Sequence, residues 1–413
     1  MIVPDEGGTP TYEPLLELED SAQFLNEEGI TTVSFFSGDG KAACAALKQR
    51  VRAVVAANPW LCGRLLRDKK RHKRLLLAFP ARSDSITDAD VERVFCDDGH
   101  GASLAKIHVG MPYAELCKAI QGSAAMVGRG HALINKPGLA VSRFTVLATP
   151  DGALALIVSV SHTVADGHTY YEVLSMLSAE VDIWPLSVQR KPECEKACID
   201  AAGKKEYAFM FSPGLLVNFI KGIVCGPKAR CFALLVDEGK VAAAKAEAKG
   251  RCGANNGASS FVSTNDILTS TFGLATDARV LMMAINWRKQ IDGLLGDDAG
   301  NYEGGLLHDR DTYALPEGPR GLPGCCETMT CQMGLITSSA FPAFNGDIQM
   351  VPLELHLPVF NVTEVPFPIA VVFRPCRDRL AVLYLADSDG FVERLRASGA
   401  PLGGCVSSDV FIG

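Results

Sequence analysis

The chain lacks the cysteine spacings that hold metal ions. Its 413 residues include 14 cysteines but no Cys-x-x-Cys pair, so we expect no structural zinc site and no other bound metal. Most of the cysteines are scattered singly, which is typical of reduced thiols that serve as small core residues. This usage favours a cytoplasmic protein over a secreted one.

Long apolar runs and an excess of basic residues are also missing. The longest apolar run, Ala153–Val160, is far shorter than the roughly 20 residues of a membrane-spanning helix, so we expect no transmembrane segment. The acidic N-terminus resembles neither a secretory signal nor a transit peptide. A net charge of −7 argues against a nucleic-acid partner. We therefore expect a cytoplasmic monomer.

Four short catalytic signatures are absent from the sequence. Without G-x-S-x-G, we do not expect a hydrolase with a nucleophile elbow, and without G-x-x-x-x-G-K-[ST], we do not expect a P-loop enzyme. The lack of H-E-x-x-H argues against that type of zinc protease, and the lack of G-x-G-x-x-G argues against a Rossmann dinucleotide enzyme. The chemistry must come from another motif.

The composition is that of a globular protein with room for two domains. Hydrophobic residues make up 48% and charged residues 21% of the chain, which places it far from disordered sequences. Strand and helix patterns alternate in both halves, so we predict an α/β fold with mixed sheets. The main predicted strands are Thr31–Ser37, Leu75–Phe79, Val141–Ala148, Ala153–Ser161, Arg279–Asn286, Glu354–Val362, Ile369–Arg374 and Leu380–Leu385.

Helix starts are marked by capping residues. Asp39 precedes an amphipathic stretch that predicts a helix over Lys41–Ala57, and Asp166 precedes one that reaches about Glu180. Thr264 is the expected cap of a third helix. Between the first two helices, Trp60–Leu66 looks extended, and a basic turn covers residues 68–73.

The segment Ala153–Gly167, ALALIVSVSHTVADG, joins the most apolar predicted strand to the second of these helices. His162 follows the strand, and its imidazole can take a proton from a hydroxyl or amine near neutral pH. Asp166 is placed to cap the helix. The N–H of Gly167 lies at the helix N-terminus, where partial positive charge would favour an oxyanion.

Other interpretations of this segment remain open from the residues alone. His162 and Asp166 could be an ordinary histidine and an ordinary helix cap, or a catalytic relay. Together with His168, they could also be three metal ligands. The remaining histidines without a sequence partner, which we expect to be structural, are His131, His308 and His356.

Several segments resemble motifs of one superfamily, in the order in which that superfamily has them. They are NPWLCGRL at Asn58–Leu65, SHTVADG at Ser161–Gly167, FVSTNDILTSTF at Phe261–Phe272, INWRKQI at Ile285–Ile291, GNYEGG at Gly300–Gly305 and FNVTEVPF at Phe360–Phe367. The superfamily is that of chloramphenicol-acetyltransferase-like acyltransferases. It includes plant BAHD enzymes, condensation domains of peptide synthetases, wax-ester synthases and dihydrolipoyl acyltransferases.

The resemblance implies a fold of two similar domains, each with a mixed β-sheet flanked by helices, and an active-site tunnel between them. We expect an N-terminal domain over 1–190 that carries the HxxxDG motif, a crossover segment over 191–228 and a C-terminal domain over 229–413. The DFGWG motif of BAHD enzymes is missing, since VPFPIAVVF stands in its place. The chain therefore does not resemble BAHD proper.

The resemblance also implies a reaction. His162 would act as the general base while an acceptor hydroxyl or amine attacks an acyl thioester, with acyl-CoA as the co-substrate and no bound cofactor. Gly167 would help to hold the oxyanion. Asp166 would turn away from the substrate and pair with Arg288. The positions that would line the substrate site are Ser263, Thr264, Asn265, Tyr302 and Asn361.

Each of these positions also has an ordinary structural interpretation. Ser263, Thr264 and Asn265 could serve only the start of a helix, Tyr302 could be a core aromatic and Asn361 a turn residue. Two other functions remain open for the whole chain. It could be a condensation-type enzyme that takes its substrate from an acyl-carrier protein, or a catalytically inactive interaction or assembly protein with this fold.

Overall fold

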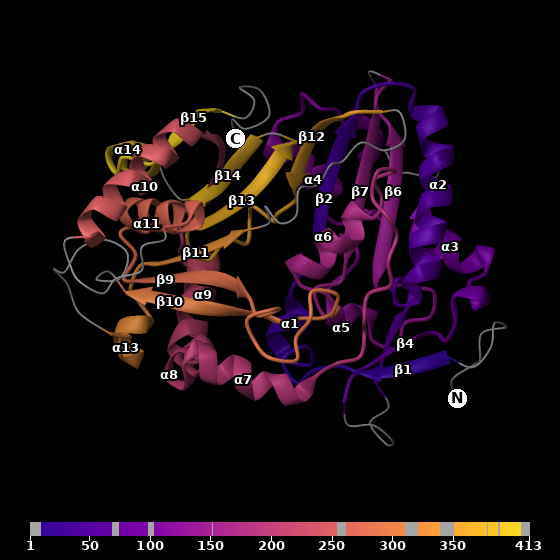
Figure 1. Ribbon diagram of the computed structural model, residues 1–413, viewed down its shortest axis with the longest axis horizontal. Helices are drawn as coiled ribbons and strands as arrows, with labels where there is room; N and C mark the ends of the chain where they lie inside the picture. The colour runs from indigo at the N-terminus through magenta and orange to yellow at the C-terminus, as the bar shows by residue number, and fades with distance from the viewer. Residues whose placement is uncertain are drawn as a thin grey trace.

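Two mixed β-sheets, each built mainly from one half of the chain, form the frame of the computed structural model (Figure 1). The structure describes residues 10–67, 74–97, 103–150, 152–253, 262–309, 321–338, 351–377, 379–386 and 389–405. The basic turn predicted at 68–73 lies outside the described residues.

The first sheet has five strands in the order β12-β2-β7-β6-β5. Its centre is β7, whose seven residues are all buried because the strand has neighbours on both edges and packing on both faces. The predicted pair of strands at its centre is antiparallel, with Ser142 opposite Val160. The strand bounds are β2 Ile30–Phe36, β5 Phe95–Cys96, β6 Ser142–Ala148, β7 Leu154–Val160 and β12 Leu353–Pro358. A separate small sheet, β1-β4-β3, is formed by Pro10–Pro14, Leu76–Pro80 and Arg64–Leu66.

The second sheet has seven strands in the order β10-β9-β11-β13-β14-β8-β15. The pairs β9–β11 and β11–β13 are parallel and the others are antiparallel. The sheet is therefore mixed, as the sequence predicted. Its strands are β8 Arg230–Val236, β9 Val280–Asn286, β10 Glu303–Asp309, β11 Met333–Ser338, β13 Ile369–Cys376, β14 Arg379–Ala386 and β15 Leu402–Cys405.

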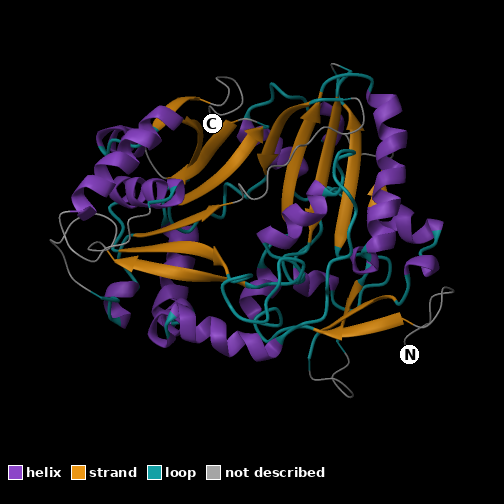
Figure 2. Cartoon of the chain, viewed as in Figure 1, coloured by secondary structure: helices purple, strands orange, loops and turns teal. Residues whose placement is uncertain are grey.

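Helices cover the outer faces of the two sheets (Figure 2). On the first sheet, α2 (Gly40–Ala57) and α6 (Gly167–Ser175) bury Leu47, Val51 and Val173 against β7. The second sheet is covered on one face by α11 (Thr264–Thr276) and α14 (Asp389–Ala397). The remaining helices are α1 Ala22–Asn26, α3 Asp88–Val94, α4 Tyr113–Ile120, α5 Gly130–Leu133, α10 Glu238–Gly253 and α13 Cys325–Thr328.

The two sheets meet through a shared apolar core. Val33 of β2 and Ile157 of β7 belong to the same cluster of buried side chains as Val371 of β13 and Leu383 of β14. Apolar contact across this cluster fixes the two halves relative to each other, because burying such area contributes about 25 cal/mol per Å².

Strand β12 belongs to the C-terminal part of the chain but pairs with β2 of the first sheet, with Leu357 opposite Val33. Figure 1 shows it beside β2, where it also contacts β13 of the second sheet without pairing with it. The first sheet is therefore completed by a strand from beyond residue 229. His356 on this strand is buried between the hydroxyl groups of Ser34 and Tyr171.

Three local predictions differ from the structure. Trp60–Leu66 is not wholly extended, because Pro59 starts a single 3-10 turn over Pro59–Cys62 before β3 begins. Helix α6 ends at Ser175 rather than near Glu180. The cap of α11 is Ser263, whose hydroxyl accepts the N–H of Asp266, and not Thr264.

The crossover segment is helical throughout most of its length. It consists of α7 Pro192–Ala202, α8 Lys204–Met210 and α9 Pro213–Cys225, which run from the first half to the second along one edge of the molecule (Figure 1). In the described residues, Lys204–Cys225 is the one helical segment that is long and apolar enough to cross a membrane. In the sequence, this segment contains no long uninterrupted apolar run, because Ser212, Pro213 and Lys221 divide it.

Burial lowers the pKa of His356 to about 3. Its folded form stays neutral where the unfolded chain already binds a proton, so its contribution to stability is complete above pH 6.5 and declines as the pH falls towards 3. Between pH 7 and pH 5 we expect His356 to cost about 2 kcal/mol of unfolding free energy. Denaturant unfolding of wild type and His356→Gln at both pH values measures this. If the wild type and His356→Gln lost the same unfolding free energy between pH 7 and pH 5, His356 would not be the cause of the loss.

Candidate active site

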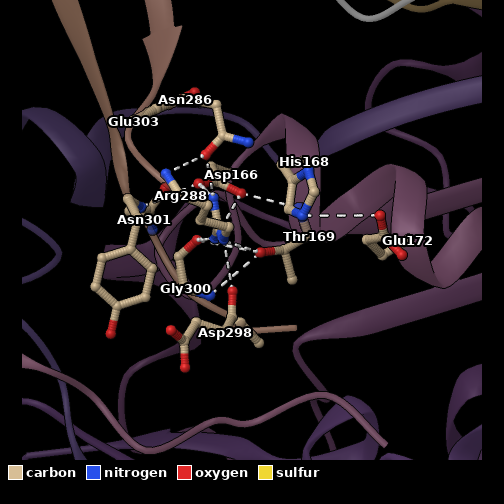
Figure 3. A network of polar contacts seen from close by, with 12 residues as sticks. Asp166, His168, Thr169, Glu172, Asn286, Arg288, Asp298, Gly300, Asn301 and Glu303 are labelled. Carbon is tan, nitrogen blue, oxygen red and sulfur yellow. Dashed lines mark hydrogen bonds and ion pairs between the residues drawn. The ribbon is translucent and has the colours of Figure 1, made fainter. Parts of the chain in front are cut away.

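A buried ion pair joins the two halves of the molecule at the end of β7. Arg288, just beyond β9, places Nη1 2.6 Å from Oδ2 of Asp166, and both side chains are almost fully buried. Figure 3 shows the guanidinium at the centre of a ring of acceptors. All of its N–H groups have partners, which are the carboxylate of Asp166, the side chains of Thr169 and Asn286, and the carbonyls of Asp298 and Gly300.

The carboxylate of Asp166 is equally well satisfied. Besides Arg288, it accepts the backbone N–H of Thr169, which makes it the N-cap of α6, and the N–H of Tyr302. Burial opposes its charge, but Arg288 and these donors outweigh burial and lower the pKa of Asp166. The predicted ion pair is thus present, and Asp166 is committed to it rather than to the His162 ring.

A second buried ion pair lies beside the first. Glu19 Oε2 accepts from Arg190 Nε at 2.9 Å, and both side chains are almost fully enclosed. The same guanidinium donates to the carbonyls of Val164 and Ala299. Arg190 therefore holds the loop that carries His162 against the loop that precedes β10.

Gly300 lets these two loops approach closely. Its φ of +139° is a conformation that L side chains rarely adopt, and a Cβ there would meet the Arg190 guanidinium at 3.1 Å. Its carbonyl also accepts the N–H of Asp166 and a donor from Arg288. A side chain at this position would disturb both ion pairs.

Asn301 fixes the orientation of His162. Its amide nitrogen donates to the carbonyl of His162 and to Glu19, so its Oδ1 is directed at His162 Nδ1, 3.2 Å away. The acceptor at this position requires the neutral ring to carry its proton on Nδ1. Nε2 is then the basic nitrogen. Phe24 of α1 contacts the ring edge-on, with the ring centroids 5.3 Å apart.

Two carboxylates approach the basic nitrogen of His162. Nε2 lies 3.4 Å from Oε2 of Glu27 and 3.5 Å from Oε1 of Glu303. Burial alone would lower the pKa of His162, but these two carboxylates outweigh it and raise the pKa. Burial also raises the pKa of Glu303 to about 7, despite the favourable effect of His162. The side chain of His162 keeps 20% of its surface exposed and so is not sealed in the core.

A hollow that is open to solvent lies beside Glu303, and His162 is not among the residues that line it, whereas the resemblance implied an active-site tunnel. It is lined from the first half by Gly167 and Tyr171 and from the second half by Asn286 and Glu303, among others. Glu303 stands between the hollow and His162. Gly167 is the first residue of α6, so the partial positive charge of that helix N-terminus faces the same space.

The structure places the predicted substrate residues in different surroundings. Tyr302 is buried beneath Arg288, with its ring centroid 5.1 Å from the guanidinium carbon, and its hydroxyl accepts the N–H of Lys191. Asn361 contacts Glu28 and shapes its own turn through Thr363. Both support neighbouring structure rather than facing the hollow.

The start of α11 is likewise occupied with local contacts. Ser263 and Asp266 cap each other, and Asn265 donates to the sulfur of Met283. Ser263, Thr264 and Asn265 are not among the residues that line the hollow. The side-chain contacts of this segment are local to α11 and β9, and none of them is with His162.

The metal interpretation of His162, Asp166 and His168 does not match their orientations. His168 Nε2 contacts the carbonyl of Gly296 at 2.8 Å and lies 3.7 Å from Oε1 of Glu172. Figure 3 draws the contact with Glu172 as a dashed line. Asp166 is turned to Arg288. Among the described residues, no cluster of three or more His, Cys, Asp or Glu side chains is placed to hold a metal ion.

Four polar residues of the site were missed by the sequence analysis. Asn301 and Glu303 lie in the GNYEGG segment that had been singled out, but Tyr302 between them was selected as the site residue. No sequence pattern distinguishes Glu19 and Glu27 as site residues, because they are two of many acidic residues near the N-terminus. Their proximity to His162 depends on how that segment folds back.

Comparisons with known proteins identify the fold. No protein-family profile and no curated protein matches the chain. Among solved structures, the first condensation domain of the CDA synthetase is 16% identical, with 95% of this chain and 98% of that one covered and a TM-score of 0.56. F. graminearum TRI101, complexed with coenzyme A and deoxynivalenol, is 13% identical with coverage of 94% and 97% and a TM-score of 0.57. Polyketide synthase associated protein 5 from Mycobacterium tuberculosis is 12% identical, with coverage of 94% and 97% and a TM-score of 0.55.

These similarities extend over nearly the whole of each chain. The protein therefore shares the two-lobed fold of these structures, which is the fold that the resemblance implied. The similarity within this fold extends to the condensation domain, to TRI101 and to the polyketide synthase associated protein alike.

Removing Arg288 should leave the carboxylate of Asp166 buried without a counter-ion. We expect Arg288→Met to lower the unfolding free energy by about 3–5 kcal/mol. The double variant Asp166→Asn/Arg288→Met removes both charges but keeps the helix cap, and should be more stable than the single variant. Denaturant unfolding measures all three proteins.

A matched control is Arg396→Met, since this arginine is exposed on α14. It should change stability by no more than about 0.5 kcal/mol. If the double variant were less stable than Arg288→Met, the uncompensated carboxylate would not be the cause of the loss.

Proposed function

We propose that the protein is an acyltransferase that moves an acyl group from a thioester to a hydroxyl or amine of a small acceptor. The observation that carries this proposal is the state of His162. Asn301 sets its tautomer so that Nε2 is basic, and that nitrogen lies 3.5 Å from Glu303, which lines a hollow shared by the two lobes. A partly exposed base beside a helix N-terminus fits acyl transfer.

In the proposed reaction, Nε2 of His162 takes the proton of the acceptor as the acceptor oxygen or nitrogen bonds to the thioester carbon. The negative charge that develops on the carbonyl oxygen is stabilised by the N-terminus of α6 at Gly167. The C–S bond then breaks, and the proton on Nε2 passes to the leaving thiolate. Asp166 and Arg288 take no part in proton transfer and serve to position the His162 loop.

Acyl-CoA is the donor that we propose. The TRI101 structures with coenzyme A support a donor of this type for the fold. The condensation-domain structures support the second candidate, a carrier-protein thioester supplied in trans. The two donors share the reacting thioester, so the chemistry at His162 is the same for both.

The charge around His162 bears on the acceptor. Glu27 and Glu303 both approach Nε2, whereas the other buried carboxylates nearby are neutralised by Arg288 and Arg190. Two carboxylates within about 4 Å of the reacting nitrogen disfavour an anionic acceptor and favour one that carries positive charge. We therefore propose a neutral alcohol, or an amine that binds as the cation and loses one proton to solvent before its nitrogen attacks, and not a carboxylate or phosphate.

The test is thiol release from a set of acyl-CoAs in the presence of pooled alcohols and amines. We expect turnover by the wild type and a loss of about 10²–10⁴-fold in His162→Ala, because the general base is removed. His131→Ala is the matched control, since this histidine is exposed on α5 and should leave the rate unchanged. Turnover only with acyl-carrier protein would favour the second donor. An absence of turnover with either donor would overturn the proposal in favour of a non-catalytic role.

The pH dependence of kcat/KM should report His162. Only the neutral imidazole accepts a proton, so the rate should rise with pH and reach half its maximum above the pKa of 6.5 of a free histidine. Glu27→Gln and Glu303→Gln each remove a carboxylate that raises this pKa, so each should move the midpoint to lower pH.

Glu28→Gln serves as the control for this profile. Glu28 is adjacent in sequence but pairs with Arg129 rather than with His162. The pH midpoint of kcat/KM in Glu28→Gln should equal that of the wild type. A midpoint that stays in place in both Glu27→Gln and Glu303→Gln would show that the titrating group is not His162.

A further inference from the structure

Helix α9 (Pro213–Cys225) presents an apolar face to solvent. Leu216, Ile220 and Val224 recur at a spacing of four, so they lie in one row along the helix. Val224 is 73% exposed and Ile220 52% exposed. We call this exposed set the α9 stripe, and its members are Leu216, Val217, Phe219, Ile220 and Val224.

The opposite face of α9 is tightly packed on the protein. A Cβ on Gly222 would meet the carbonyl oxygen of Pro366 at 1.8 Å, and one on Gly214 would meet that of Cys325 at 2.9 Å. Leu215 belongs to a buried cluster with Val280 of β9 and Met333 of β11. These contacts hold the helix against the protein. Because the opposite face of α9 is the one that is buried, the α9 stripe is exposed in the folded protein.

The same contacts decide how this segment could meet a membrane. Lys204–Cys225 is apolar enough to span one, but the chain breaks at Ser212, whose extended backbone caps α9 after α8 has ended. Spanning would require one continuous helix that leaves its buried cluster. At about 1.5 Å per residue, the 13 residues of α9 reach roughly 20 Å, which is also too short to cross. The helix is suited to lie on a membrane instead.

Basic residues lie before, within and after the α9 stripe in the sequence, and the first of them, Lys204, is ion-paired with Asp200. From Lys204 to Arg230 the sequence has five Lys or Arg and one Glu, a net charge of +4 in a chain whose total is −7. Lys221 borders the stripe on α9, and Lys204 and Lys205 lie at the start of α8. Lys228 and Arg230 follow the end of α9, and all five basic side chains are exposed.

We propose that the α9 stripe and these five basic residues bind the surface of a lipid bilayer that contains anionic lipids. The aliphatic row would enter the boundary between headgroups and acyl chains while the lysines and the arginine contact lipid phosphates. A bilayer matches this surface in charge and in apolar character, and it needs no complementary shape. Soluble monomers seldom leave an apolar patch of this kind uncovered.

This surface has a fixed relation to the candidate active site. Val280 and Met282 of β9 pack in the cluster under α9, and Ala284, on the same face of that strand, lines the hollow. Val280, under α9, and Ala284, at the hollow, are four residues apart along β9, which is about 13 Å. The α9 stripe lies on the side of the helix that faces away from these strand residues, so the thickness of α9 adds to this distance. The proposal itself concerns binding and does not depend on the acyl-transfer chemistry.

The test is co-sedimentation of the full chain with vesicles. One set contains phosphatidylcholine alone, and the other contains phosphatidylcholine mixed with phosphatidylserine. We expect binding to the mixed vesicles that weakens as salt is added. Lys221→Gln and Lys228→Gln should each weaken it by roughly fivefold, as expected for one charge near an anionic surface. Ile220→Asp/Val224→Asp should abolish it.

Leu139→Asp is the matched control, because Leu139 is 47% exposed but lies in the first half of the chain. It should bind as the wild type does. Circular dichroism of the double variant shows whether α9 substitution preserves the fold, and Leu216→Ser replaces it if the fold is lost. Absence of vesicle binding by the wild type at low salt would overturn the proposal. So would a concentration-dependent dimer, measured by analytical ultracentrifugation, that the double variant abolishes while vesicle binding is absent.

Discussion

The buried pair of Asp166 and Arg288 is the interaction on which the rest of the site depends. Each charge would be costly in the interior by itself, and the surrounding hydrogen bonds make the pair tolerable by satisfying every donor of the guanidinium. Because Asp166 begins α6 and Arg288 follows β9, the pair joins an element of one lobe to an element of the other. The position of the His162 loop relative to the second sheet follows from this link.

The second ion pair, Glu19 with Arg190, extends the same constraint to the histidine itself. Glu19 accepts from Asn301, and Asn301 in turn contacts both the carbonyl and the ring of His162. A chain of contacts thus runs from a buried arginine to the nitrogen that carries a proton, and the opposite nitrogen is left basic. The fully buried charges serve to position the histidine, while the partly exposed carboxylates of Glu27 and Glu303 adjust its affinity for protons.

The crossover segment has two roles in this arrangement. Arg190, the residue before its start, holds the His162 loop, and α9, near its end, covers one part of the sheet face whose other part lines the hollow. The buried side of α9 is specified by glycines that allow close approach to Pro366 and Cys325. Its outer side is apolar and bordered by positive charge. These two properties are the basis for the proposed binding to an anionic bilayer.

The sequence by itself determined the fold class, the central strand pair, the cap at Asp166 and its partner Arg288. The strand pair and the cap depend on local patterns, namely a β-branched strand and a capping residue. The pairing with Arg288 was implied by the resemblance to the superfamily. The tertiary structure alone decided which acidic residues surround His162, that Asn301 rather than Tyr302 contacts it, and that Ser263, Thr264, Asn265 and Asn361 do not. These outcomes depend on contacts between segments as far apart as residues 19 and 301. No local pattern encodes such a contact, because it arises only when the two lobes and the crossover pack together.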